Sequence, residues 1–217
     1  MFKQYRELQS GEFMVIAADT ALGGGDRCAA QFISKTRVDV PAVYHSNQSA
    51  TEMTNALVPI LEGIYDITKV KPVIAYERNN GGAFEMERLA TLNRLGKFKI
   101  YQMKRQGFVD GKEETLLGWD TNSASRPAML QQLKEAIDTH VLKLYDKETV
   151  QELFSFVTVQ TSSSWKAQAE AHAHDDLVMA LAIGWQLYQT EKPEVPMVNQ
   201  QQRKIYEEIV RKGESWR

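Results

Sequence analysis

The sequence predicts an α/β fold in which a central mixed sheet of five or more strands is flanked by helices and carries an added β-hairpin. Three strand-like segments near the N-terminus follow one another as in an antiparallel meander. A helix-spaced segment then leads to residues 73–76, a run that is apolar throughout, as central parallel strands are. With 217 residues the chain is long enough for one large core, expected over residues 1–192.

In the first half, a buried strand is expected over residues 13–18, followed by a glycine-rich turn, 19–27. Strands over 28–34 and 38–45 complete the meander. From Ser49 onward, apolar residues recur at helical spacing, with Thr51 and Glu52 as polar start residues. The strand at 73–76 follows, and after a turn a helix is expected over about 83–95, ended by Gly96.

In the second half, residues 97–103 are expected to form a strand, and the polar stretch after it contains Asp110-Gly111, a strong hairpin-turn signal. Pro127 suits the first turn of a helix that runs to about 139. A strand-like piece, 141–144, leads through a short acidic segment to a strand at 153–159, and a loop at 161–164 precedes a buried helix at about 175–190. Residues 193–217 are expected to be a linker and a C-terminal amphipathic helix. The order of elements is that of the ribonuclease H fold.

Acidic residues stand at the edges of three apolar segments. Asp19 follows residues 14–18, Glu77 follows 73–76, and the pair Asp175-Asp176 precedes 177–182. Taken singly, these residues also suit a turn cap, an ion pair with Arg78 or a helix N-cap. Taken together, they are expected to converge, and convergent carboxylates repel one another unless a cation joins them. Oxygen ligands without a matching cysteine or histidine set favour Mg²⁺ or Mn²⁺ over zinc.

Composition and charge narrow the function further. A formal net charge of -2 excludes a generic nucleic-acid binder but leaves room for a local basic groove. The single cysteine, Cys28, lies in an apolar run and is expected to be a small buried side chain. There is no signal-peptide core and no apolar run of roughly 20 residues, so we expect a cytoplasmic protein without a membrane partner.

Four motifs, in order, resemble the nuclease domain of the large terminase subunit of tailed bacteriophages. Together they cover almost the whole chain up to about residue 190. They are Ala18-Asp19-Thr20-Ala21-Leu22-Gly23-Gly24-Gly25-Asp26, Tyr76-Glu77-Arg78-Asn79-Asn80-Gly81-Gly82, Gly118-Trp119-Asp120-Thr121-Asn122 with Ser125-Arg126-Pro127, and His174-Asp175-Asp176-Leu177-Val178-Met179-Ala180-Leu181-Ala182.

The resemblance implies a metal-dependent endonuclease that cuts concatemeric double-stranded viral DNA during genome packaging. Two divalent cations, Mg²⁺ or Mn²⁺, would lie about 4 Å apart and clamp the scissile phosphate. Asp19, Glu77 and Asp176 would take the metal-binding positions, with Asp175 serving the second metal or orienting the other ligands. Asp26 stands where the first motif of the family has a second acid, and it would support metal binding.

For several other residues, the sequence is compatible with two different roles. His174 suits a group beside the metals as well as a plain helix-start residue. Lys104, Arg105, Arg126 and Lys166 are candidates for contacts with the DNA backbone, although such charges usually belong to a solvated face. Arg126 equally suits anchoring Glu152 or another acid.

The chain departs from the family pattern by lacking the phosphate loop of the ATPase motor, since the turn Gly23-Gly24-Gly25 has no following lysine and helix start. We therefore expect an excised domain or a separately encoded nuclease without ATPase activity. Expected partners are double-stranded DNA and, in the packaging motor, the ATPase domain, the portal protein and the small terminase subunit. The alternatives are another ribonuclease H-like nuclease, such as a junction resolvase or a transposase core, and a DNA or portal docking module that is inactive without its motor.

Overall fold

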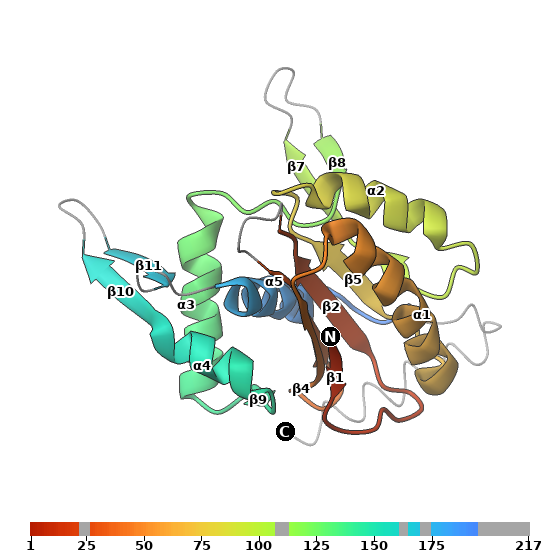
Figure 1. Cartoon of the computed structure of the whole chain (residues 1–217), viewed down its shortest axis with the longest axis horizontal. Coiled ribbons are helices and arrows are strands. Elements are labelled where there is room, and N and C mark those ends of the chain that lie inside the picture. The colour runs from red at the N-terminus through yellow and green to blue at the C-terminus, as the bar shows by residue number, and fades with distance from the viewer. Residues whose placement is uncertain (22–26, 107–112, 161–164, 170–174, 195–217) are drawn as a thin grey trace.

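The centre of the molecule is a seven-stranded mixed sheet (Figure 1). The structure, a computed structural model, describes residues 1–21, 27–106, 113–160, 165–169 and 175–194. The strands of the sheet are β1 (Phe2–Gln4), β2 (Met14–Asp19), β3 (Cys28–Ser34), β4 (Asp39–Ser46), β5 (Val73–Tyr76), β6 (Lys99–Ile100) and β9 (Lys143–Leu144). They run in the order β1-β4-β3-β2-β5-β6, with β9 paired to β4. Strands β2, β3 and β4 form the predicted antiparallel meander, and β5 lies parallel to β2, so the predicted fold class is confirmed.

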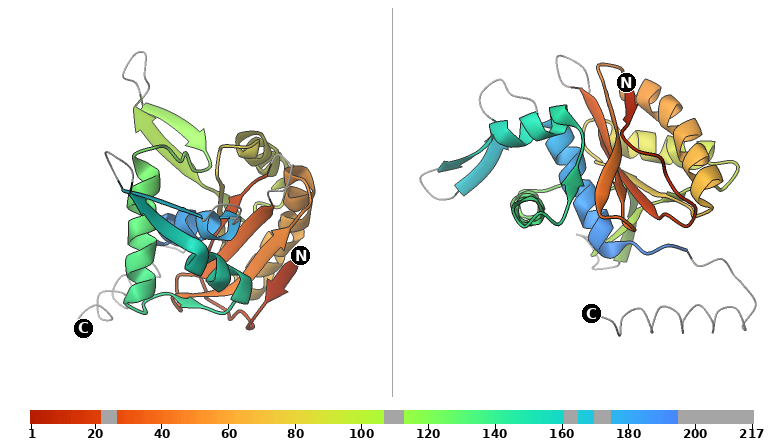
Figure 2. Two further views of the ribbon diagram at one scale, coloured as in Figure 1. Left: turned by 60° about the vertical axis from the view of Figure 1, so that its left-hand side comes forward. Right: turned by 90° about the horizontal axis from the view of Figure 1, so that it is seen from below.

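Helices cover both faces of this sheet (Figures 1 and 2). Helices α1 (Ala50–Thr68) and α2 (Gly82–Leu92) lie on one face. Helix α5 (Asp176–Thr190) lies on the other, with α3 (Ser125–Asp138) and α4 (Lys147–Ser155) packed against it. Helix α5 is buried by the sheet on one side and by two helices on the other, which explains why its sequence is apolar nearly all round.

Strand β2 is buried on both faces because it separates two cores. Met14, Ile16 and Ala18 belong to the core under α1 and α2. Val15 and Ala17 belong to the core under α5. Successive side chains of a strand point to opposite faces, so a central strand with two covered faces must be apolar at every position. Cys28, at the start of the neighbouring strand, is fully buried as predicted, and burial raises the pKa of its thiol.

Helix α1 begins with a capping box at Ser49, where the helical spacing of the sequence begins. Ser49 is the N-cap, and its hydroxyl accepts the Glu52 N–H at 3.3 Å. The Glu52 carboxylate accepts the Ser49 N–H at 2.9 Å in return. The next predicted helix is shorter than expected, because α2 ends at Leu92 and Gly96 lies in the turn beyond it, with φ +60°.

The predicted strand over 97–103 is divided in two. Its first part, β6, pairs with β5 in the central sheet, whereas β7 (Gln102–Gln106) leaves the sheet and pairs with β8 (Glu113–Leu117). This two-stranded hairpin projects from the body, as predicted (Figure 1). The turn residues Asp110 and Gly111 lie outside the described residues.

The sequence prediction is wrong for residues 147–155 and misses the strand at 165–169. The acidic segment and the start of the expected strand form helix α4, and the rest of the expected strand is extended, as β10 (Phe156–Gln160). Strand β10 pairs with β11 (Trp165–Ala169) in a second hairpin that was not predicted. The helix forms because Asp146 caps it, accepting the Thr149 N–H at 2.7 Å, and because Leu153 packs into the core under α5.

The predicted C-terminal helix at about 199–212 lies outside the described residues. Within the described ranges, no helix combines the length and the apolar character that a bilayer crossing requires.

Two glycines provide a matched test of the fold. Gly118 has φ +89°, and a Cβ there would lie 2.7 Å from the Tyr76 carbonyl oxygen. Gly63 lies inside α1, where a Cβ would meet nothing within 4 Å. We expect Gly118→Ala to lower the free energy of unfolding by more than about 1 kcal/mol and Gly63→Ala to raise it by about 0.5–1 kcal/mol. Urea denaturation measures both, and equal effects of the two substitutions would contradict this account of the Gly118 turn.

Candidate metal centre

The sheet places Asp19 and Glu77 side by side. Asp19 is the last residue of β2, and Glu77 follows β5, which pairs with β2 in parallel. The Glu77 N–H donates to the Ala18 carbonyl at 2.8 Å, which continues the pairing beyond the strand. Alternation then determines the face: Asp19 follows Ala17 and Glu77 follows Ala75 at two-residue spacing, and both alanines pack under α5. Both carboxyl groups therefore lie on the α5 side of the sheet.

Helix α5 begins with the other two predicted acids. Asp175 is its N-cap residue and Asp176 its first residue. Asp176 is buried, and its Oδ2 accepts the Arg27 N–H at 3.3 Å. Asp175 is half-buried, and its carboxylate accepts a hydrogen bond from Arg126 Nη2 at 2.6 Å.

The four acids interact electrostatically. The pKa of Asp19 lies well above its usual range because the side chain is buried and because Glu77, Asp176 and Asp175 carry negative charge nearby. Hydrogen bonding with the Glu77 side chain raises the pKa of Asp19 further. The structure thus brings Asp19, Glu77, Asp175 and Asp176 to one end of the sheet.

The loop after β5 holds Glu77 in place. Asn79 Nδ2 donates to Glu77 Oε1 at 3.2 Å, and the Thr20 hydroxyl lies 3.2 Å from the carbonyl oxygens of Asn79 and Asn80. At the end of this loop, Gly82 packs directly against the Glu77 backbone. A Cβ at this position would lie 1.8 Å from the Glu77 carbonyl oxygen, so a larger residue does not fit. Arg78 does not turn back on Glu77 but donates to the Leu117 carbonyl at 2.6 Å.

The segment after the β7–β8 hairpin bonds to the backbone on either side of Glu77. The Trp119 N–H donates to the Tyr76 carbonyl at 2.8 Å, and the Arg78 N–H donates to the Trp119 carbonyl at 2.8 Å. This parallel bridge between Glu77 and Trp119 ties the third sequence motif to the second. Two of the four motifs therefore meet beside the acids through backbone hydrogen bonds.

The donor set fits a hard divalent cation. The groups gathered here are carboxylates, and the oxygen-only chemistry is what Mg²⁺ and Mn²⁺ prefer. As the described side chains stand, no three histidine, cysteine, aspartate or glutamate residues converge closely enough to ligate one ion. A cation bound here would stabilise the ionised form of Asp19, which burial and the neighbouring charges disfavour.

The structure describes only some of the remaining predicted site residues. Asp26 and His174 lie outside the described residues, as do the side chains of Arg105 and Lys166 on β7 and β11. Lys104 is exposed on β7 and forms an ion pair with Glu113 at 2.6 Å. Arg126 lies in the first turn of α3 and anchors an acid, which is one of its two predicted roles, although the acid is Asp175.

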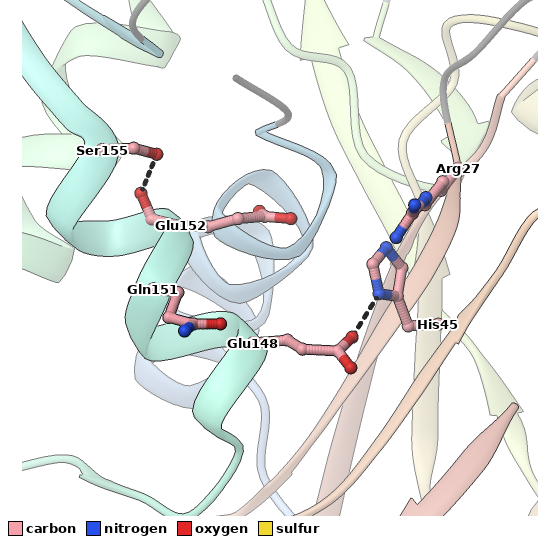
Figure 3. A pocket seen from close by; sticks show the side chains of 6 residues that line it. All are labelled: Arg27, His45, Glu148, Gln151, Glu152 and Ser155. Atoms are coloured by element: carbon pink, nitrogen blue, oxygen red, sulfur yellow. Dashed lines mark hydrogen bonds and ion pairs between the residues drawn. The ribbon is translucent and has the colours of Figure 1, made fainter. Parts of the chain in front are cut away.

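One residue of the site was missed as a functional candidate. Glu152, on α4, accepts the backbone N–H groups of Leu177 and Val178 at 2.9 and 3.2 Å. Burial, and then the charges of Asp176 and Asp175, raise the pKa of Glu152 to about 7. It also lines a cavity of about 260 Å³ beside Arg27 and His45 (Figure 3). The helical spacing of Thr149, Val150 and Leu153 was the sequence signal that would have placed Glu152 on a helix.

The raised pKa of Asp19 makes a prediction about stability and pH. A carboxyl group whose pKa is higher in the folded than in the unfolded state binds more protons when folded, so its penalty appears as the pH rises above its unfolded pKa. In chelator, Asp19→Asn should therefore gain stability relative to the wild type between pH 4 and pH 8. Asp138→Asn, which removes an exposed partner of Lys134, is the control and should shift stability by less than about 0.5 kcal/mol. Thermal melts at each pH measure the difference, and a constant offset across the range would contradict the prediction.

Comparison with known proteins gives a structural likeness. No family model matches the sequence, and no curated protein matches it. The nuclease domain of the large terminase of Thermus phage P74-26 has a TM-score of 0.60 at 15% identity, over 88% of this chain and 85% of that one. The large terminase nuclease of thermophilic phage G20c, solved with bound magnesium, has a TM-score of 0.59 at 16% identity, over 88% and 86%. The human cytomegalovirus terminase nuclease domain, soaked in manganese, has a TM-score of 0.55 at 12% identity, over 85% and 91%. The chain therefore has the fold of the terminase nuclease domains.

Proposed function

We propose that this chain is a metal-dependent endonuclease that cuts concatemeric double-stranded DNA during viral genome packaging. The observation that carries the proposal is the meeting of four acids, from three separate segments, at one end of the sheet. A shared fold alone does not determine activity, so the chemistry of this site is the stronger argument. The likeness to terminase nuclease domains supports the choice of DNA as substrate.

Asp19, Glu77 and Asp176 would hold two divalent cations, Mg²⁺ or Mn²⁺, with Asp175 beside them. When bound, such cations lower the pKa of coordinated water and stabilise the charge that develops on the attacking and leaving oxygens of the phosphodiester. The protein contributes position: Asn79 orients Glu77, and Arg126 orients Asp175. Since Asp19, Glu77 and Asp176 are buried at the sheet end, their carboxyl groups have few other arrangements available.

The DNA backbone would be bound beside the acids by basic side chains. Lys104 lies on the projecting β7–β8 hairpin and Arg126 lies at the start of α3, with Arg105 and Lys166 as further candidates. Contacts of this kind read phosphate rather than base sequence, so binding should be weakly specific and strongly dependent on salt. In a packaging motor, the partners would be the ATPase domain, the portal protein and the small terminase subunit.

Substitution of the acids tests the proposal directly. Asp19→Asn and Asp176→Asn each remove one charge with little change of shape, and each should lower the rate of plasmid cleavage in Mg²⁺ or Mn²⁺ at least about 100-fold. Circular dichroism should show that the fold is retained. Asp138→Asn, on the exposed surface of α3, should cut at the wild-type rate, and a chelator should stop cutting by all proteins.

If the Asp19→Asn variant cut plasmid at the wild-type rate, the assignment of the site would be wrong. A strong preference for branched junctions over linear duplex would favour a junction resolvase instead. A wild-type protein that binds DNA but does not cut it in any of these metals would favour the docking module.

Removal of one hairpin charge tests the DNA surface. Lys104→Gln should weaken binding to linear duplex and reduce the slope of log K against log salt by about 1, because one phosphate contact is lost. Lys134→Gln is the matched control, since Lys134 is also exposed and paired with an acid but lies on α3, near its C-terminal end. Fluorescence anisotropy over a salt series measures both slopes, and an unchanged slope for Lys104→Gln would remove that residue from the surface.

A further inference from the structure

The start of α5 is capped by a different helix. The first amides of an α-helix have no partner within it, and an N-cap aspartate ordinarily accepts one of them. Asp175 occupies the N-cap position, yet its side chain makes no capping hydrogen bond. Glu152 of α4 accepts the Leu177 and Val178 N–H groups at 2.9 and 3.2 Å instead. These are the amides that a capping side chain of Asp175 would have bonded.

Capping by Glu152 leaves the Asp175 carboxylate available for other contacts. Asp175 extends to Arg126 at 2.6 Å, and Asp176 turns toward Arg27 and Asp19. A carboxylate that accepts the amides of its own helix is directed back along that helix. The cap by Glu152 therefore frees Asp175 to lie beside Asp176 at the sheet end.

Glu152 is itself held rigidly. The Gln31 side-chain amide on β3 donates to Thr149 Oγ1 on α4 at 2.9 Å and lies 3.2 Å from the Leu177 carbonyl oxygen on α5. Gln31 is fully buried, and Thr149 is fixed further by Asp146 at the start of α4. One buried amide thus ties together the strand, the helix that provides the cap and the helix that is capped.

We propose that Glu152 is a positioning residue of the metal centre, which fixes the first turn of α5 so that Asp175 and Asp176 face Asp19 and Glu77. The inference rests on the proposed function, because it assigns Glu152 a part in the same site. Glu152 acts through the α5 backbone, as partners of metal ligands commonly do, and not by contact with the DNA.

Three substitutions of Glu152 distinguish the effect of its capping hydrogen bonds from the effect of its negative charge. Glu152→Ala removes the acceptor, Glu152→Asp keeps the charge but withdraws the oxygens by one methylene, and Glu152→Gln keeps an acceptor oxygen but loses the charge. A capping role requires that Mn²⁺ affinity, measured by calorimetry, fall about tenfold in the Ala and Asp variants and stay within about threefold of wild type in the Gln variant. The concentration of Mn²⁺ that gives half-maximal plasmid cleavage should shift in the same order.

Hydrogen exchange provides a readout that needs no metal. In chelator, the amides of Leu177 and Val178 should exchange faster in the Ala and Asp variants than in the wild type, whereas the amides in the middle of α5 should not change. Glu148→Gln is the matched control: Glu148 lies one turn earlier on α4 and lines the same cavity, but bonds to His45 (Figure 3) and to Lys3. It should alter neither exchange at α5 nor Mn²⁺ affinity.

The outcomes distinguish the two proposals. If the wild type binds Mn²⁺ and cuts DNA but the Ala and Asp variants keep its affinity and exchange rates, Glu152 has no positioning role. If the Asp variant keeps wild-type affinity while the Gln variant loses it, charge and not capping is responsible, and the inference is also wrong. If the Ala variant does not fold, the Asp and Gln variants still decide between these results. A wild type that neither binds Mn²⁺ nor cuts DNA would overturn the proposed function, and the inference with it.

Discussion

The mutual repulsion of buried carboxylates is the constraint on which the rest of this structure depends. Asp19, Glu77 and Asp176 are each less than a tenth exposed, and Asp175 lies beside them. Groups buried in this way are costly to ionise, and each negative charge makes the next more costly. The pKa of Asp19 is raised as a result. A site that stores such repulsion is suited to bind cations.

The surrounding elements keep the acids together against that repulsion. Parallel pairing of β2 with β5 fixes two of them, and Asn79 holds the Glu77 carboxylate by a hydrogen bond. Helix α5 presents the positive end of its dipole to the carboxylates, which favours them electrostatically. Arg126 compensates the outermost acid, Asp175, and Glu152 bonds the free amides of the helix.

Much of this arrangement was predictable from local sequence patterns. The meander, the apolar strand before Glu77 and the buried last helix follow from periodicity, and the acids are conspicuous because they end apolar runs. Helix α4 and the second hairpin were missed, since the β-branched residues of 156–160 extended the expected strand backward over a helix that is stabilised by packing on α5. Glu152 was missed as a functional residue for the same reason. Its role depends on contact between α4 and α5, which no local pattern encodes.

The most direct test of the account is the structure of the wild-type protein in crystals soaked with Mn²⁺, with anomalous scattering used to locate the metal. We predict anomalous density within coordination distance of the carboxylate oxygens of Asp19, Glu77 and Asp176. Anomalous density elsewhere on the molecule, or none, would contradict the assignment of these acids as the metal centre.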